Sequence, residues 1–415
     1  MTRSIAKEAV RMLRSFRLGN HRSFRDEQEL LLMPAMPGDE RAAVPVAAVY
    51  GANASGKSNL FKAMTLVMGA VMNRHLPTSA GRHIVAVQDP FRLGLGAEPR
   101  PSTFVFELIA DGVQYTYGFL LDEDEIIEEW LYSYPEKRRR VVFERDRDGI
   151  KFGTTVVDLK QKLEVLEELI RPTALFLSVC DRLELGPLMP VYRWFSSGLL
   201  VNGLGGGWFG SEFVQGAVGD YLLRHPENRQ RMVSLLSVAD VGIVDVVVEE
   251  RLDSPRRFTG AFDLELKLLH GPARERFDFD DESSGTRNWI GLLPQVLSAL
   301  DEGLVLLVDE IDASLHPLLT ARLVGLFQDP ELNNHGAQLV FTTHDTSLLG
   351  TMLGEQVLDR DQIWFVERDA EGASSLYPLT DFKPRKDQNT ERRYLAGSYG
   401  AVPVLGDFAE ALRSR

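Results

Sequence analysis

Residues 49–59 read VYGANASGKSN, and they contain the pattern G-x-x-x-x-G-K-S from Gly51 to Ser58. The apolar run VPVAAV precedes the pattern and is typical of a short buried strand. The residues that follow, NLFKAM, have the spacing of a helix. Strand, glycine-rich loop and helix in this order form the context of a loop that binds nucleotide phosphates. These flanks argue against a chance match in a glycine-bearing turn, so we predict a nucleotide site here.

Each residue type in this loop has a physical task. Gly51 and Gly56 let the backbone turn and bring N–H groups onto the phosphates, and the start of the helix adds its partial positive charge. Lys57 is expected to reach the β- and γ-phosphates, and Ser58 to give its hydroxyl to Mg²⁺. The predicted nucleotide-binding residues of the loop are Gly51, Asn53, Ala54, Ser55, Gly56, Lys57, Ser58 and Asn59.

The composition is that of an ordinary globular chain. Its 415 residues are 44% hydrophobic and 26% charged, and the length suits two domains or one large core with a sizeable insertion. No apolar run approaches the length of a membrane span, which argues against an integral membrane protein. The first twenty residues lack an apolar h-region, and Cys180 is the only cysteine, so neither a secretory signal nor a disulfide framework is predicted. We expect a cytoplasmic protein.

The net charge of −14 bears on nucleic-acid partners. A protein whose whole surface gripped DNA phosphates would normally be basic, so any DNA or RNA contact has to be local. Clusters of basic residues offer three candidate sites, although each also suits a solvated face with balanced charge. They are Lys137–Arg140, Arg256 with Arg257, and the tail residues Lys383, Arg385, Lys386, Arg392 and Arg393.

Residues 303–310, GLVLLVDE, predict a buried strand that ends in two carboxylates. The carboxyl end of such a strand is where parallel sheets hold ligands. Asp309 is expected to hold Mg²⁺ through water, and Glu310 to orient and deprotonate the attacking water as a general base. Two acids that cap the next helix are the structural alternative.

Residues 338–345, QLVFTTHD, predict another buried strand, which ends at His344. A lone histidine after a strand is usually structural. This one follows the Asp-Glu strand by one helix and one strand, where a γ-phosphate sensor is expected. We therefore predict a catalytic role for His344.

Residues 281–288, DESSGTRN, open a predicted helix about twenty residues before the Asp-Glu strand. Small hydroxyl residues at a helix start are ordinary caps. The Ser-Ser-Gly start also resembles the signature motif of ABC-type ATPases. In that motif, groups at the positions of Ser284 and Gly285 contact the γ-phosphate of a nucleotide held by the other subunit.

Together, these four segments resemble the ABC-type ATPase superfamily, in the branch that includes SMC proteins, RecF and the OLD family. The resemblance implies an α/β fold, namely a P-loop ATPase head with a mixed parallel core sheet, an antiparallel β-subdomain and a compact helical insertion lobe. It implies ATP and Mg²⁺ as cofactors, and a homodimer or higher oligomer with composite ATP sites.

The start of the chain adds to the resemblance. Residues 18–25, LGNHRSFR, resemble the N-F-[RK]-S-F strand with which those proteins open, although His21 replaces the usual aromatic residue. Arg22 is then expected near the adenine or ribose. Gln88 is a candidate for the glutamine of the Q-loop.

Two further segments narrow the resemblance to the RloA- and AbiL-like ATPases of phage-defence operons. Residues 311–317, IDASLHP, occupy the D-loop position but depart from the Leu-Asp of transporters. Residues 393–403, RYLAGSYGAVP, resemble the Y-L-x-G-x-Y-G-A-V-P ending of the RloA-like group, as residues 90–93 and 115–119 resemble other parts of it.

The spacing divides the chain into four parts. Residues 1–150 are predicted as the N-terminal half of the ATPase head with the antiparallel β-subdomain, and 151–240 as the helical lobe. Residues 241–380 are predicted as the C-terminal half of the head, and 381–415 as the tail.

Local patterns support this division. Alternation over 103–119 around Asp111-Gly112 predicts a hairpin, and 126–143 continue as strands. Helical spacing dominates 157–236. Residues 244–250 and 261–268 are predicted to return to the core as strands.

Only about seventy residues follow His344, too few for the nuclease domain of OLD proteins, so no intrinsic nuclease is expected. Three functions remain open. The chain is the ATPase subunit of a defence system that gates a separate, nuclease-like effector, or a DNA-repair clamp of RecF type, or a transport ATPase. The large insertion and the opening strand disfavour the last.

Overall fold

The structure is a computed structural model of the chain. It describes residues 10–72, 89–93, 100–159, 170–179, 185–202, 210–239, 242–250, 264–313, 315–353, 356–383, 388–403 and 412. Several residues of the sequence predictions lie outside these ranges, namely Gln88, Cys180, Arg256, Arg257, Arg385 and Lys386.

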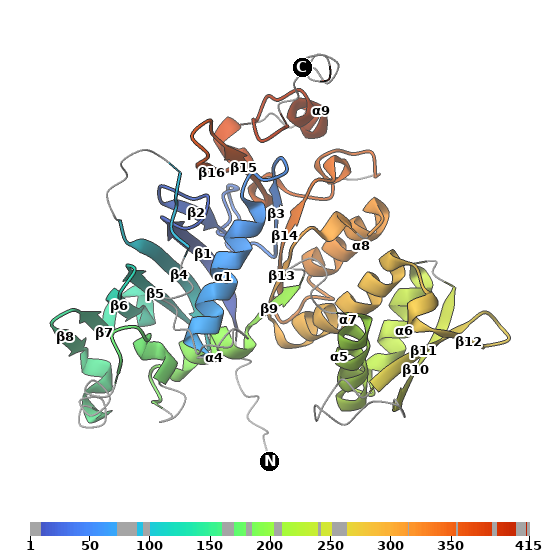
Figure 1. Ribbon diagram of the computed structural model, residues 1–415, viewed down its shortest axis with the longest axis horizontal. Coiled ribbons are helices and arrows are strands. Elements are labelled where there is room, and N and C mark those ends of the chain that lie inside the picture. The colour runs from blue at the N-terminus through green and yellow to red at the C-terminus, as the bar shows by residue number, and fades with distance from the viewer. Residues whose placement is uncertain are drawn as a thin grey trace.

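A six-stranded sheet forms the centre of the molecule (Figure 1). Its order is β16-β15-β3-β14-β13-β9, and all neighbouring strands are parallel except β15 and β16. The strands β3, β13 and β14 are buried throughout. The apolar runs of β3 and β13 predict this burial. The bounds are β3 Val46–Tyr50, β9 Leu199–Asn202, β13 Val305–Val308, β14 Gln338–Thr343, β15 Ile363–Arg368 and β16 Ser374–Pro378.

Successive residues of β3 face opposite sides of this sheet, and each side has its own core. Ala47 and Val49 pack in a cluster with α1, α4 and the antiparallel sheet. Val46, Ala48 and Tyr50 pack in a second cluster with α7 and α8. Helices therefore cover both faces of the sheet. Their bounds are α1 Lys57–Val71, α4 Met189–Ser197, α7 Ser284–Glu302 and α8 Pro317–Gln328.

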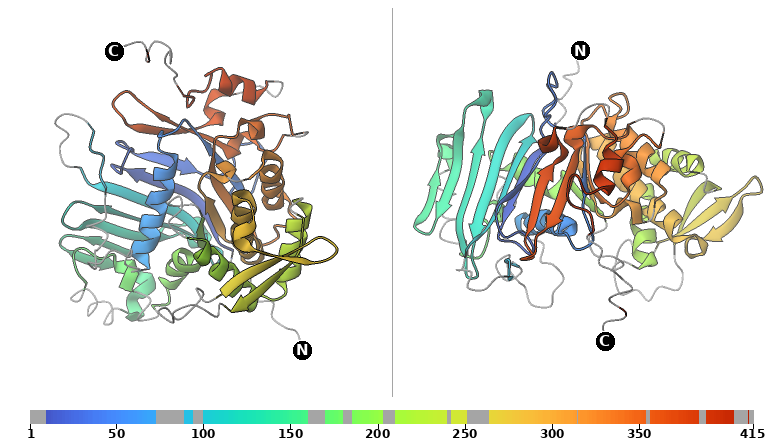
Figure 2. Two further views of the ribbon diagram at one scale, coloured as in Figure 1. Left: turned by 45° about the vertical axis from the view of Figure 1, so that its right-hand side comes forward. Right: turned by 90° about the horizontal axis from the view of Figure 1, so that it is seen from above.

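A seven-stranded antiparallel sheet, of order β2-β1-β4-β5-β6-β7-β8, stands beside the core sheet (Figure 2). Its hairpin β4–β5 turns at Asp111 and Gly112, whose φ angles of 51° and 74° suit a two-residue turn. The hairpin predicted over 103–119 and the strands over 126–143 are confirmed. The bounds are β1 Met12–Gly19, β2 Gln28–Leu31, β4 Ser102–Ala110, β5 Val113–Leu121, β6 Ile126–Ser133, β7 Arg140–Asp146 and β8 Gly149–Phe152. The mixed α/β class, with a parallel core sheet and an antiparallel sheet, is thus confirmed.

The lobe on the other side of the molecule differs from the prediction. Residues 244–250 and 261–268 were expected to return to the core as strands, and residues 261–263 lie outside the described ranges. The strands β10 and β11 do not join the core sheet but pair with each other in a separate sheet of order β10-β11-β12. The helices α5 and α6 pack against this sheet (Figure 2). Alternating apolar residues identify a strand but not its partner, which tertiary packing selects. The bounds are α5 Ser211–Arg224, α6 Asn228–Val238, β10 Ile243–Glu250, β11 Leu264–His270 and β12 Glu275–Asp278.

A second difference concerns residues 151–240, which were predicted to be a helical lobe. This segment contains β9, which pairs with β13 at the edge of the core sheet, and α4, which packs with α1. An apolar run as short as that of β9 cannot be told from a helical segment by periodicity alone. Among the elements that the structure describes in this segment, α5 and α6 belong to the lobe.

Short helices complete the described elements. No helix among the described residues is long and apolar enough to cross a membrane. The remaining elements are α9 Thr390–Leu395 and the 3₁₀ helices η1 Pro135–Lys137, η2 Thr154–Leu159, η3 Phe176–Val179, η6 Phe279–Asp281, η7 Ile311–Ala313, η8 Thr346–Leu349, η9 Arg360–Gln362 and η10 Leu379–Phe382.

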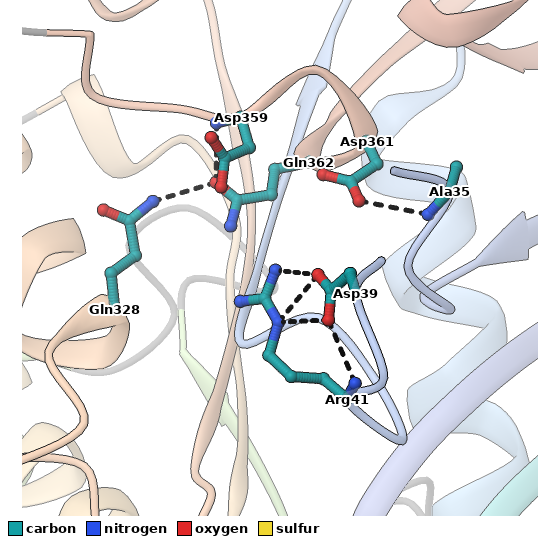
Figure 3. Close-up of polar contacts among 7 residues, drawn as sticks. All are labelled: Ala35, Asp39, Arg41, Gln328, Asp359, Asp361 and Gln362. Carbon is teal, nitrogen blue, oxygen red and sulfur yellow. Dashed lines mark hydrogen bonds and ion pairs between the residues drawn. The ribbon is translucent and has the colours of Figure 1, made fainter. Parts of the chain in front are cut away.

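Buried polar side chains fix the segment that leads into β15, as Figure 3 shows. Asp361 accepts a hydrogen bond from the backbone N–H of Ala35 at 3.1 Å. Gln362 accepts one from the side chain of Gln328 in α8 at 2.8 Å. Burial raises the pKa of Asp361. These contacts tie the loop between β2 and β3, the core sheet and α8 together at the amino edge of the sheet.

Candidate nucleotide site

Two glycines shape the loop that follows β3. A Cβ on Gly51 would collide with the carbonyl oxygen of Val366, and a Cβ on Gly56 would meet the hydroxyls of Ser23 and Ser374. Gly56 also has a φ of 117°, in the region that favours glycine. The loop can therefore approach its neighbours this closely only with glycine at both positions.

Two neighbouring segments hold the loop. The side-chain amide of Asn59 donates to Ser23 Oγ at 2.8 Å, and the backbone N–H of Ser374 donates to the Ser23 carbonyl at 2.6 Å. The hydroxyl of Ser374 donates to the carbonyl of Ser55. The turn after β1 and the β15–β16 hairpin thus enclose the start of α1. Asn53 is exposed on the loop, whereas Asn59 is half-buried and bonds to Ser23.

Lys57 is buried at the start of α1. Its ammonium group donates to the carbonyl oxygens of Gly51 at 2.8 Å and Ala52 at 3.1 Å. Burial lowers the pKa of Lys57 to about 8, although the carboxylates of Glu310 and Asp309 oppose this shift. In the described part of the chain, no side chain caps the start of α1. A buried cation bonded to carbonyl oxygens, beside uncapped N–H groups, fits an anion such as a phosphate.

Asp309 and Glu310 follow β13 and share one hydroxyl. Thr342 Oγ1 donates to Asp309 Oδ1 at 2.6 Å and accepts from the backbone N–H of Glu310 at 2.7 Å. Thr342 is fully buried, and Glu310 has an exposed side chain and a φ of 51°. The hydroxyl therefore fixes both the carboxylate of Asp309 and the backbone of Glu310. The sequence does not reveal Thr342, because threonine is ordinary in a strand.

His344 follows β14, which lies between β3 and β13 in the sheet. Its backbone N–H donates to both carboxylate oxygens of Asp312, at 3.2 and 3.1 Å. Partial burial, and then the positive charge of Lys57, lower the pKa of His344. Its imidazole is therefore neutral at pH 7 and has one donor and one acceptor nitrogen.

These groups form one site at the carboxyl edge of the core sheet. The charges of Asp309, Glu310 and Asp312 act on the pKa of both Lys57 and His344. Segments that are about 250 residues apart in the sequence thus supply a cation, three carboxylates and an imidazole to one place.

Arg22 lies in the turn after β1, beside the loop. It has a φ of 51°, its N–H donates to the Asp89 carbonyl at 2.6 Å, and its Nε lies 3.8 Å from the Asp89 carboxylate. A contact between Arg22 and adenine or ribose stays a prediction. His21 is buried against Phe104, with ring centroids 5.3 Å apart, and burial lowers its pKa to about 4. A neutral imidazole thus occupies the usual aromatic position.

Ser284 and Gly285 form the first turn of α7, where the hydroxyl of Ser283 caps the helix. The helix α7 covers the face of the core sheet opposite α1. Just before it, Glu282 lies 2.6 Å from His270 Nε2, which fixes the start of α7 to β11. The structure thus places Ser284 and Gly285 apart from the face that carries α1. Their contact with a nucleotide of a second chain stays a prediction.

The donor set for a metal ion is small. Among the residues that the structure describes, no group of three or more His, Cys, Asp or Glu side chains is placed to hold a metal. Mg²⁺ usually keeps several waters and binds through one or two carboxylates together with substrate phosphates. The hydroxyl of Ser58 and the carboxylate of Asp309 fit this mode. Both would hold Mg²⁺ only together with a nucleotide.

One of the predicted basic clusters lies within the described residues as a unit. Lys137–Arg140 are exposed in the turn between β6 and β7. Arg139 lies 3.8 Å from the ring centroid of Tyr132 and forms an ion pair with Glu144 at 3.2 Å. Part of this positive charge is therefore neutralised locally.

A family model described as "AAA domain, putative AbiEii toxin, Type IV TA system" matches residues 46–156 and 187–350, which is more than half of the chain. The matched residues include the loop, Asp309, Glu310 and His344. No curated protein matches the chain significantly.

Several solved SMC head domains are similar to the chain. An SMC head bound to the C-winged helix domain of ScpA has a TM-score of 0.49 and 15% sequence identity, and the match covers 90% of this chain and 99% of that chain. The SMC head domain from Thermotoga maritima has a TM-score of 0.42 and 17% identity over 88% of this chain and 98% of that one. A head domain from Pyrococcus furiosus, bound to the C-terminal domain of ScpA, has a TM-score of 0.44 and 13% identity over 90% and 98%. With every TM-score below 0.5, the family assignment does not depend on these similarities.

Proposed function

Because the chain belongs to this family of AAA domains, we propose that it is an ATPase whose ATP-dependent pairing with a second copy gates a separate effector in a prokaryotic anti-phage defence system. The P-loop ATPase assignment follows from the family. The pairing, the effector and the biological setting are the parts that need experiments.

The observation that carries the proposal is the meeting of Lys57, Asp309, Glu310 and His344 at one edge of the sheet. Lys57 and the uncapped start of α1 bind the phosphates. The carboxylate of Glu310 takes a proton from the attacking water, whose oxygen bonds to the γ-phosphorus as the bond to the β,γ-bridging oxygen breaks. The neutral imidazole of His344 donates a hydrogen bond to the γ-phosphate. Mg²⁺, held through Ser58 and Asp309, would neutralise charge on the phosphate oxygens.

The first test is ATP binding and turnover by the purified chain. Lys57→Ala should lose measurable ATP binding, because it removes the buried cation that is proposed to bind the phosphates. Arg193→Ala, on the exposed side of α4, serves as the matched control and should bind as the wild type does. Wild-type protein that neither binds nor hydrolyses ATP in the presence of Mg²⁺ would overturn the proposal.

The proposed pairing rests on Ser284 and Gly285, whose helix lies on the other face of the sheet from the chain's own phosphate loop. Two chains related by a two-fold axis would place each signature helix on the nucleotide of the other. Lys57→Ala and Ser284→Arg should each be inactive alone. Mixing them should restore up to about a quarter of wild-type turnover, because random pairing gives one intact composite site in half of the dimers. Absence of restoration in samples that contain mixed dimers contradicts the shared site.

The proposed effector is a separate, nuclease-like protein. The toxin–antitoxin description of the family supports a partner protein but does not specify its activity. A DNA clamp of the RecF and SMC kind is the second candidate, and the exposed turn Lys137–Arg140 favours it. A clamp binds duplex DNA with an affinity whose logarithm falls by about 0.9 per phosphate contact for each tenfold rise in salt. Co-purification of a nuclease supports the first candidate, whereas ATP-dependent retention on circular DNA supports the second.

A further inference from the structure

The tail pattern YLAGSYGA lies beside the core sheet, near β15 and β16 (Figure 1). Its helix α9 packs on η8, which begins two residues after His344. We propose that the tail, residues 388–403, is a positioning element that holds the His344 loop relative to the phosphate loop during ATP hydrolysis. This inference rests on the proposed ATPase function.

The tail has a defined conformation of its own. Gly397, Gly400 and Ala401 have φ angles of 74°, 67° and 56°, and these turns bring the chain back onto α9. The hydroxyl of Tyr394 donates to the Ala401 carbonyl at 3.0 Å. Tyr394, Tyr399 and Ala401 are at most 5% exposed. The glycines and tyrosines of the pattern are therefore required by one compact turn, which docks as a unit.

One contact of the tail reaches the strand that leads into the phosphate loop. The ring of Tyr394 stacks on Phe365 of β15, with centroids 5.4 Å apart, and meets the ring of Tyr50 edge-on at 5.8 Å. Tyr399 stacks on Phe365 as well, at 5.7 Å. Tyr50 is the last residue of β3 and directly precedes Gly51. The tail thus packs against Tyr50, the residue directly before the phosphate loop.

A second contact reaches the His344 loop. Glu391 of α9 accepts a hydrogen bond from the hydroxyl of Thr346 at 3.3 Å. A Cβ on Gly350, the residue that ends η8, would meet the carboxylate of Glu391 and lie 3.2 Å from its Cβ. Asp345 caps η8 by accepting from the N–H of Ser347 at 2.9 Å. The backbone from His344 to Gly350 is therefore held between β14 and α9.

The residues proposed to bind the phosphates and the residue proposed to act in hydrolysis are supported by different parts of the chain. The carbonyl oxygens of Gly51 and Ala52 hold the ammonium group of Lys57. Ser23 and Ser374 support the start of α1. His344 has one backbone anchor in Asp312 and depends on α9 for the far end of its loop. A small displacement of a catalytic group lowers the rate far more than it lowers the affinity. Loosening the contact between α9 and η8 should therefore lower kcat and leave KM for ATP unchanged.

Gly350→Ala tests the contact without removing any of its polar groups. The backbone at Gly350, with φ −112° and ψ −166°, accepts an alanine, so the added methyl acts through Glu391. We expect kcat to fall about tenfold, with KM within twofold of wild type. Glu391→Ala alone should lower kcat to a similar extent. The double variant should have a kcat close to that of Glu391→Ala, because the carboxylate that the methyl meets is then absent and only the contact with the Cβ of residue 391, at 3.2 Å, remains. Leu395→Ala, exposed on the same helix, is the matched control and should leave kcat unchanged.

The outcomes distinguish the two proposals. Wild-type turnover that Glu310→Gln abolishes, together with unchanged kcat in both Gly350→Ala and Glu391→Ala, overturns the positioning role and leaves the ATPase assignment intact. A rise in KM that equals the loss of kcat/KM also overturns it. A wild-type chain without ATPase activity overturns both. Circular dichroism and thermal unfolding of each variant separate these outcomes from loss of the fold.

Discussion

The two edges of the core sheet are built from the same strands, yet their polar groups differ. Those at the amino edge are buried and hydrogen-bonded to the backbone, whereas those at the carboxyl edge are charged and partly exposed. At the amino edge, the amide of Gln338 accepts from the Leu13 N–H at 2.6 Å and donates to the carbonyls of Leu13 at 2.9 Å and Val44 at 3.0 Å. Gln338 is only 2% exposed. One buried side chain at the start of β14 thus joins the antiparallel sheet, through β1, to the core sheet.

The carboxyl edge lies six residues further along the same strand β14. Its polar groups are those of the candidate nucleotide site. Lys57 has a pKa lowered to about 8 by burial. Glu310 has a left-handed backbone and an exposed side chain. The difference indicates that the amino edge contributes stability, whereas the carboxyl edge keeps charge and strain in place for a ligand.

Glu310→Gln, at the carboxyl edge, is expected to change the rate of ATP turnover more than any other substitution proposed in this comparison. It removes the proton acceptor but keeps the size of the side chain, so turnover should fall about 10²- to 10⁴-fold. ATP affinity and the free energy of unfolding should stay close to wild-type values. Single-turnover hydrolysis, nucleotide titration and urea unfolding measure the three quantities. Failure of Glu310→Gln to bind ATP would show that Glu310 serves binding and not proton transfer.

Gln338→Leu should give the opposite pattern. The substitution removes the hydrogen-bond partner of the buried Leu13 N–H and one donor from each of two buried carbonyls, which should cost about 3 kcal/mol of unfolding free energy. The value of kcat for the folded fraction should not change. Urea unfolding and steady-state kinetics at low temperature measure both, and Gln230→Leu on the exposed face of α6 is the control for added hydrophobicity. A loss of kcat without a loss of stability would contradict the division between the edges.

Thr342→Val sharpens the comparison within one strand. The isosteric side chain keeps the packing but removes the hydroxyl that Asp309 and the Glu310 N–H share. Hydrogen bonds to charged groups are worth about 1.5–3 kcal/mol, so kcat should fall about 10- to 100-fold. Thr342→Ser, which restores the hydroxyl, should recover most of the rate. Equal rates for the valine and serine variants would rule out a role for the hydroxyl.

Residues with a fixed chemical task could be predicted from the sequence, and residues that support them could not. Gly51, Gly56 and Lys57 stand out because their spacing is required by the loop. Thr342 and Gln338 do not, because their partners are about 30 to 325 residues away in the sequence and nothing local reports the contact. The predicted hairpin was correct for the same reason, since the turn at Asp111 and Gly112 is a local requirement.

The pairing partners of β9, β10 and β11 could not be predicted for the same reason, because they lie far away in the sequence or are chosen by packing. The alternating pattern of β10 and β11 shows that they are strands, but not that they pair with each other outside the core sheet. β9 is four residues long, and its place beside β13 depends on packing against α4 and α7. Pairing between distant segments is decided by tertiary contacts, which a single sequence does not display.

The smallest effect, and the most specific for the carboxyl edge, is the pH dependence of ATP affinity. Burial lowers the pKa of Lys57 to about 8 in the free protein, and bound phosphates would raise it again by stabilising the ammonium form. Below pH 8 the free protein already carries the proton, so affinity should be constant there. Above pH 8 binding must take up a proton, so affinity should fall about tenfold per pH unit.

Titration with a non-hydrolysable ATP analogue between pH 7 and 9.5 measures this slope. Calorimetry in two buffers of different ionisation enthalpy measures the proton taken up. Lys57→Arg provides the matched control, because a guanidinium stays charged throughout this range. The affinity of this variant for the ATP analogue is expected to be lower than that of the wild type, because arginine has a different shape. It should not depend on pH, because the charge of the side chain does not change in this range. A flat wild-type profile would mean that Lys57 is already charged in the free protein at pH 9.5. The carboxylates of Asp309, Glu310 and Asp312 would then outweigh burial, and the carboxyl edge would be as well satisfied without a ligand as the amino edge is.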